Sequence, residues 1–496
     1  MQQAAYESLP RSRRTALHAM IAKALIERNP ILADTDLNLL AYHCEQGGLT
    51  EKAAYFYTRA GFGSTRHGAY IEAHEQFANA LRMVTAMPKG ELRDRRELEL
   101  VLCFITATRL HHGYGCSKAA KAHRRAAELW DRLGRPAEYL EAPRARYLFH
   151  YARSETQSAQ EIALDLLHTS QEQVDPRHRI MGHLLMGYTG VIRGEPLEAE
   201  AHLRDALALI QSYSADPSEP WKSLSDIDAL NLWTSWAMIN IALGRAKCLL
   251  GYLDQALAHL SAIVEHTPPT GYPASQVEFW AIYVIASSFF NEAAELARPV
   301  ERLSKLAREF GVASFDAVAM IYRGYIISSC GGLEKGIVLM NEGMEAYAAI
   351  GAVLWSGHYR VLLAEAYQRL GCLQKARELL ILAQDVAERT GERWYDAELA
   401  RRLGEVDRQE GDIYAAENRF KQALAIARRQ HAKLWELHAA TSLARLWHEQ
   451  HRGAEARAVL TPVYGWFKEG LQTGSLRNAK ALLDELEQGR VVDLSH

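Results

Sequence analysis

The residues of this chain best suited by type and spacing to bind phosphate form one glycine-rich stretch, Gly61-Phe-Gly-Ser-Thr-Arg-His-Gly68. A phosphate-binding P-loop also needs a lysine after its glycines and a β-strand before them. The stretch lacks the lysine, and no strand pattern precedes it. Its first and last glycines also fall on a repeat that runs through the chain, so the structural interpretation is favoured.

Histidines offer a second kind of chemistry, the binding of a metal ion. His448-Glu-Gln-His451 resembles a zinc-binding helix, but its histidines are three residues apart instead of four, and no third ligand is evident. For the pair His111-His112, before a Gly-Tyr-Gly turn, a metal role is the lesser alternative to a structural one. No Gly-x-Ser-x-Gly nucleophile motif occurs, and no carboxylate pair stands out for acid–base catalysis. We therefore expect no enzyme activity, no cofactor and no metal.

A five-point pattern returns about every forty residues and predicts how the chain is built. A small residue is followed by glycine at step seven, alanine or glycine at step twelve, a large apolar residue at step sixteen and a small one at step nineteen. The copies begin at Ala41, Gly61, Gly187, Gly244, Gly324, Ala364, Gly404 and Ala444, and only the last, with His451 at step seven, lacks the glycine. A unit repeated at this spacing is typical of a solenoid, which usually offers a surface for binding.

Each copy predicts a hairpin of two helices. Glycine at step seven ends the first helix, because it accepts the left-handed backbone that reverses the chain. The first small residue lets the helices approach closely, and the large residue fills the space between them. The last small residue is expected to face the neighbouring unit. One helix near 53–66 serves the first two copies, and further helices are expected near 115–127, 159–167 and 293–303.

Composition excludes several classes of protein. The net charge is −3 with basic and acidic residues mixed, so no basic face is available for nucleic acid. Six cysteines without a Cys-x-x-Cys pair fit reduced thiols. We find no signal-peptide pattern and no apolar run of the roughly 18 residues that a membrane span needs. The expectation is a cytoplasmic protein that binds neither nucleic acid nor membrane.

Beyond the pattern, whole stretches resemble a known family. These include Ala4–Leu9 with Arg11–His18, His43–Tyr55, Thr390–Arg393, Leu437–Leu446, Pro462–Gly470 and Ala479–Leu486. The chain resembles the tetratricopeptide-like (TPR-like) C-terminal tail of large bacterial signal-transducing ATPases, often fused to class III adenylate or guanylate cyclase domains. The family's usual acidic residues are missing after Gly470. The resemblance implies a tail that senses or recruits a protein partner and regulates an ATPase and its output domain.

The fold class predicted is all-α, a right-handed α-solenoid of TPR-like hairpins with a period near 40 residues. The resemblance assigns 1–34 to the end of a helical domain that follows an ATPase. TPR-like repeats are expected at 35–211 and 231–470, separated by a proline-containing linker or insertion at 212–230, with a second break at Pro268–Pro273. Residues 471–496 are expected to form a capping helix and tail.

The groove of a TPR-like solenoid is lined by the first helix of each hairpin. By that likeness, the residue after each first small position should face a protein or peptide partner: Tyr188, Arg245, Tyr325, Glu365, Glu405 and Arg445. Ordinary solvated or interlocking residues are the structural alternative.

Our first hypothesis is a non-catalytic interaction module with an ATPase or cyclase domain near its N-terminal end. The alternatives are the regulatory half of a nucleotide cyclase and, last, the helical arm of a LuxR-type transcription regulator, which should carry a basic helix-turn-helix.

Overall fold

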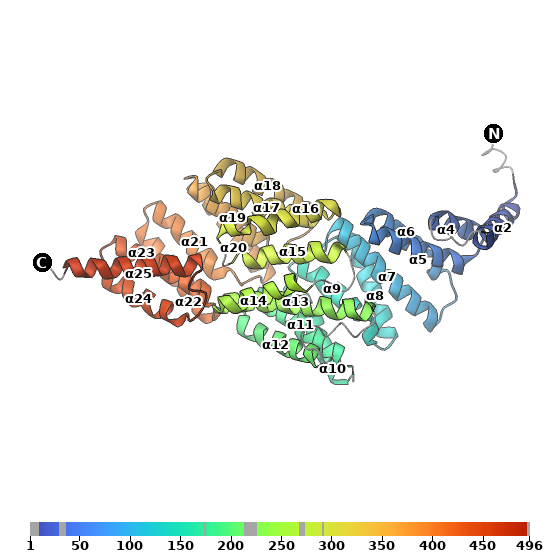
Figure 1. Cartoon of the computed structure of the whole chain (residues 1–496), viewed down its shortest axis with the longest axis horizontal. Helices are drawn as coiled ribbons and strands as arrows, with labels where there is room; N and C mark the ends of the chain where they lie inside the picture. Colours follow the sequence, from blue (N-terminus) through green and yellow to red (C-terminus); the bar gives the residue numbers. More distant parts are fainter. Residues whose placement is uncertain are drawn as a thin grey trace. The chain divides into compact units, whose positions relative to one another are not determined.

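A computed structural model describes residues 9–28, 36–172, 175–212, 226–266, 273–289 and 292–493. Throughout these residues the backbone forms helices joined by turns, with no strand (Figure 1), so the all-α prediction is confirmed. Two breaks are predicted, at 212–230 and Pro268–Pro273, and residues 213–225 of the first and 268–272 of the second lie outside the described residues. Helices begin at Asp226 and at Pro273, so the last part of each predicted break is helical. The chain divides into two compact units: unit 1 comprises 1–146 with 310–312, and unit 2 comprises 147–309 with 313–496.

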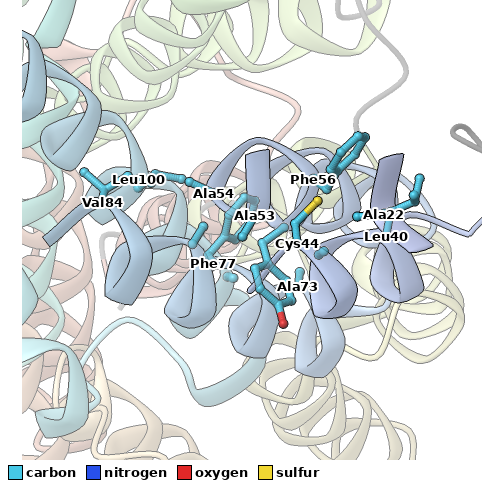
Figure 2. Close-up of a cluster of buried hydrophobic side chains, with 14 residues drawn as sticks. Ala22, Leu40, Cys44, Ala53, Ala54, Phe56, Ala73, Phe77, Val84 and Leu100 are labelled. Atoms are coloured by element: carbon cyan, nitrogen blue, oxygen red, sulfur yellow. The ribbon is translucent and has the colours of Figure 1, made fainter. Parts of the chain in front are cut away.

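Unit 1 consists of helices, most of which contribute to a common apolar cluster. Its main helices are α2 (Arg11–Arg28), α4 (Leu37–Gln46), α5 (Thr50–Arg66), α6 (Tyr70–Thr85), α7 (Glu91–His112) and α8 (Ala120–Arg132). Helix α5 packs against both α4 and α6, which confirms the prediction that one helix serves two copies of the repeat. Figure 2 shows the cluster, in which Ala22 of α2 joins Leu40, Ala53 and Phe77.

Unit 2 is a stack of hairpins. Its helices are α10 (Thr156–Glu172), α11 (Pro176–Arg193), α12 (Pro196–Gln211), α13 (Asp226–Leu250), α14 (Leu253–Glu265), α15 (Pro273–Ser287), α16 (Ala297–Glu309), α17 (Ala313–Ser329), α18 (Leu333–Ala349), α19 (Ser356–Arg369), α20 (Leu373–Thr390), α21 (Asp396–Gln409), α22 (Ile413–Arg429), α23 (Lys433–Glu449), α24 (Gly453–Trp466) and α25 (Gly474–Asp493). Helix α9 (Glu141–Ala152) crosses the boundary between the units. The first helices of successive hairpins touch in order, α11, α13, α15, α17, α19, α21 and α23, and α25 packs on α23 and α24. This order is that of a helical-repeat solenoid.

The turn of each hairpin has the backbone that the repeat predicts. All seven step-seven glycines have positive φ, from 71° at Gly48 to 99° at Gly331. His451, which replaces glycine in the eighth copy, also lies in this region, at φ 60°. The turn geometry is therefore fixed by the fold, and glycine is the residue that adopts it with the least strain.

The small first position is confirmed as a site of close helix approach. A Cβ atom added at Gly404 would lie 2.7 Å from the ring of Phe420, the large residue of the same copy. The expectation for the last small residue is wrong at Gly343. Its nearest neighbours are Ala317 and Ile321 of α17, which is the first helix of its own hairpin.

Gly411→Ala is expected to lower the free energy of unfolding by about 1–2 kcal/mol, because an L-residue is strained in the left-handed region. No atom lies within 4 Å of the added Cβ, so backbone strain is the whole effect. Urea denaturation followed by circular dichroism measures it. The reciprocal variant His451→Gly should raise the midpoint, and a lower midpoint for His451→Gly would contradict the explanation by strain.

Unit 2 also contains contacts between segments about 200 residues apart. The carbonyl of Ala152, at the end of α9, accepts hydrogen bonds from the backbone N–H groups of Val353 and Leu354, both at 3.0 Å. Forty residues on, the carbonyl of Ile192 near the end of α11 accepts from Arg393 and Trp394, at 2.8 and 3.2 Å. Carbonyls at helix C-termini lack partners within their helix, so the turns of the later hairpins satisfy the ends of the earlier ones.

Candidate functional site

A cavity of about 450 Å³ is lined mainly by the first helices of several successive hairpins of unit 2. Its wall consists of residues from α17, α19, α21, α23 and α25, together with Ser288, Phe289 and Glu292. Contacts place α19, α21, α23 and α25 side by side in this order, and Figure 1 shows α21, α23 and α25 as neighbours. The volume is within the range of ligand-binding clefts.

Helix α21 contributes the charged centre of this wall. Glu398, Arg401, Arg402, Glu405 and Arg408 recur at steps of three and four residues, which places them along one face of a helix. Since α19 and α23 flank this helix, the same face can pair with residues of two neighbouring hairpins.

Three carboxylates of the wall, those of Glu398, Glu405 and Glu365, are each shared by two arginines. Glu398 accepts from Arg401 at 2.6 and 2.7 Å and from Arg402 at 2.7 Å. Glu405 pairs with Arg408 at 3.1 Å and with Arg401 at 3.5 Å, and it accepts from Ser442 of α23 at 2.7 Å.

On the other side, Glu365 of α19 pairs with Arg402 at 2.7 Å and with Arg369 at 2.6 Å. The network therefore joins three consecutive hairpins through their first helices.

The network also sets the protonation of its members. Burial would raise the pKa of Glu398, but Arg401 and Arg402 together lower it well below its ordinary value. The pKa of Glu405 is lowered in the same way, mainly by Arg401 against the effect of burial. Glu365, and then burial, raise the pKa of Tyr325. The two glutamates are thus ionised and Tyr325 is neutral at neutral pH.

A second part of the cavity wall is aromatic. Phe289 and Trp435 line it, each 5% exposed, and the buried Trp394 lies behind them, 4.7 Å from Phe289 between ring centroids. His358 is 7% exposed beside these rings, and burial lowers its pKa to about 3, so its ring is neutral. The buried Nε2 of His358 makes no hydrogen bond with the described residues.

The structure brings together four of the six residues that the sequence predicts for the groove. Tyr325, Glu365, Glu405 and Arg445 all line the cavity. Arg445 is exposed and forms no ion pair with any residue that the structure describes. Partner binding by these residues stays a prediction.

The other two predicted residues lie apart from the cavity, in the interior of unit 2. Tyr188 of α11 is 3% exposed, and its ring centroid lies 5.7 Å from that of Tyr151. Arg245 of α13 is 1% exposed, donates to the hydroxyl of Tyr151 at 3.3 Å and stacks over the ring of Trp355 at 4.1 Å.

Several wall residues were missed from the sequence: Glu398, Arg401, Arg402, His438 and Ser442. One signal could have identified them. Glu365 with Arg402, and Glu405 with Ser442, are pairs 37 residues apart, close to the repeat period. A search for complementary side chains one period apart on predicted first helices would have found both pairs.

Comparison with known proteins agrees with this architecture. Residues 357–429, which form α19 to α22, match the tetratricopeptide repeat family. An uncharacterized protein of Rhizobium meliloti (strain 1021) is 21% identical over 452 residues, which cover 90% of this chain and 42% of that protein. The chain therefore spans about two fifths of the length of this relative.

The chain is also similar to several solved structures, among them the following three. One is a Rap protein complexed with competence and sporulation factor (TM-score 0.45, 11% identity, 88% of this chain and 99% of that one). Another is the APC/C hetero-tetramer Cut9-Hcn1 (TM-score 0.40, 16% identity, 97% of this chain and 95% of that one). The third is a signal transduction ATPase with numerous domains from Pyrococcus horikoshii, which has a tetratricopeptide repeat sensor (TM-score 0.35, 15% identity, 98% of this chain and 66% of that one).

The stacked hairpins and the repeat match define the class of this chain: it is a TPR-like helical-repeat protein. Repeat proteins of this class bind partners on extended concave surfaces. Among the described helices, none is both long and apolar enough to cross a lipid bilayer. The described residues also include no group of three or more His, Cys, Asp or Glu side chains that could hold a metal ion.

Proposed function

We propose that this chain is a non-catalytic protein-interaction module and that a segment of a partner protein binds in the cavity on α17, α19, α21, α23 and α25. The observation that supports this most is positional. Tyr325, Glu365, Glu405 and Arg445 share one step of the repeat, and all four line the same cavity. A periodic row of this kind is how a solenoid presents a continuous binding surface.

We also propose that the module is the sensing tail of an ATPase-coupled signalling protein in the cytoplasm, with a cyclase or another output domain. The resemblance of Arg11–His18, Leu437–Leu446 and Pro462–Gly470 to such tails supports this role. The 1–34 segment would then belong to the ATPase side, and 35–211 and 231–470 to the repeats. A partner that binds in the cavity would change the restraint on the ATPase.

Asn478→Trp is expected to reduce partner capture at least tenfold. Asn478 is an exposed residue of the cavity wall, so a bulky side chain there obstructs the cavity whatever the chemistry of the partner. The measurement is a pull-down with the full chain as bait, quantified by mass spectrometry. Lys480→Trp, at an exposed position of α25 outside the cavity wall, is the matched control.

The result separates the two proposals. Equal capture by both tryptophan variants and the unaltered chain would show that the cavity is not the binding site. An ATPase or cyclase domain among the proteins captured through another surface, retained by Asn478→Trp, would support the coupling role.

A further inference from the structure

The charged wall of the cavity leaves no carboxylate free for a basic ligand. Glu398, Glu405 and Glu365 are each held by two arginines, and the pKa values of Glu398 and Glu405 are lowered by those neighbours. At the rim, Glu292 is paired with Arg477, and Glu449 with Arg408. A lysine or arginine of a partner would have to displace one of these ion pairs.

Arginine, by contrast, is in excess. The side chains that line the cavity or pair with its lining include six arginines, Arg369, Arg401, Arg402, Arg408, Arg445 and Arg477, against the five glutamates Glu292, Glu365, Glu398, Glu405 and Glu449. His438 adds no charge at neutral pH, because burial lowers its pKa. The extra guanidinium is Arg445, which is exposed and without an ion pair among the described residues. Its planar group suits a carboxylate.

The aromatic part of the wall makes a smaller contribution. Phe289 and Trp435 are each 5% exposed, so they offer a ligand only a small apolar area, and beside them the buried Nε2 atom of His358 has no hydrogen-bond partner among the described residues. Apolar area removed from water stabilises a complex by about 25 cal/mol per Å². A ligand with a polar group at His358 would also satisfy a buried atom that is otherwise unpaired.

We propose, building on the proposed function, that the cavity recognises an acidic segment of a protein partner. A carboxylate of the segment pairs with Arg445, and an apolar side chain with a neighbouring polar group packs on Phe289, Trp435 and His358. A basic segment would bind unfavourably, because the glutamates of the wall are already paired with arginines. Binding is therefore selective mainly for a negative charge at Arg445, which is exposed.

The test is selection of random heptapeptides displayed on phage against the immobilised full chain. We expect Asp or Glu to be enriched in peptides selected by the unaltered chain, and Lys or Arg by Arg445→Glu. Arg302→Glu makes the same charge change at an exposed position of α16 outside the cavity wall and should select as the unaltered chain does.

A synthetic peptide of the enriched sequence and its Asn/Gln analogue then give the size of the effect. Removal of the acidic groups should weaken binding to the unaltered chain about tenfold, equal to about 1.4 kcal/mol, and should not weaken binding to Arg445→Glu. Acidic enrichment that persists in Arg445→Glu, or enrichment without acidic residues, would overturn the ligand class and leave the proposed function standing. Selection of no peptides, or of the same peptides by Asn478→Trp, would overturn the proposed function itself.

Discussion

Replacing Glu398 with glutamine is expected to lower the free energy of unfolding by about 3–5 kcal/mol, the usual effect of removing one member of a buried ion pair. The Glu398 side chain is 9% exposed and compensates two arginines, Arg401 and Arg402, whose side chains are 13% and 21% exposed. Without the carboxylate, both guanidinium groups stay in a poorly solvated wall with one negative charge fewer. The loss should therefore exceed that of any surface pair.

Urea denaturation followed by circular dichroism and tryptophan fluorescence measures this effect. The control is Glu455→Gln, which removes an exposed ion pair with Arg452 and should leave the midpoint near that of the unaltered chain. The stabilisation by Glu398 should be present above pH 4.5, the ordinary pKa of a glutamate, and be lost as pH falls through its lowered native pKa. Equal midpoints for the two variants would contradict a buried network.

The second large effect is expected at Glu392. The stability of the Glu392→Gln variant, measured relative to the unaltered chain, should be higher at pH 8 than at pH 5. Glu392 is fully buried between the turns that join distant hairpins of unit 2. One carboxylate oxygen accepts from the indole of Trp394 at 2.9 Å, and the other accepts from the backbone of Trp355 at 3.3 Å and from Ser154 at 3.4 Å. Burial raises its pKa to about 7, although Trp394, Trp355, Arg245 and Ser154 act in the opposite direction.

The sign follows from proton binding in the two states. The native carboxyl holds its proton up to about pH 7, whereas the unfolded one releases it near pH 4.5, so folding takes up a proton between these values. Stability of the unaltered chain therefore falls as pH rises through this window, by about 3 kcal/mol in total at 1.36 kcal/mol per pKa unit. The glutamine variant cannot ionise and should lack this part of the slope.

Urea midpoints at pH 5, 6, 7 and 8 for the unaltered chain, Glu392→Gln and Glu388→Gln test this prediction. Glu388 is an exposed glutamate of α20, and its variant should follow the unaltered chain at every pH. If the slope of Glu392→Gln matched that of the unaltered chain, Glu392 would not be the group that titrates.

Most of the fold could be predicted from local steric rules. Glycine at Gly371 and Gly411 predicts a helix end because few other residues adopt a left-handed backbone without strain, and both turns have positive φ. The spacing of Gly404 and Phe420 predicts a close hairpin because a small residue must face a large one, and the two are in contact distance. These requirements act within about twenty residues, so the order of the amino acids is enough to determine them.

The cavity was predictable only in part, because rules that act within about twenty residues do not determine how separate hairpins meet. The row of Tyr325, Glu365, Glu405 and Arg445 follows from the repeat period, since equivalent residues on successive first helices lie on one face of a stack. Glu398 and Arg402 complete the wall because of the way neighbouring hairpins are rotated relative to one another. That rotation cannot be predicted from the sequence of a single repeat unit.

The contacts between distant hairpins were decided by the tertiary structure alone. Arg245 and Tyr188 occupy the same step of the repeat as the cavity residues, yet they lie in the interior of unit 2. Arg245 stacks over Trp355, 110 residues further along the chain, and Tyr188 packs beside Tyr151 of α9. The stacking of the hairpins brings these segments together. The sequence by itself determined each hairpin and the face that it presents, whereas the stacking of many hairpins determined which parts of that face stay open to a partner.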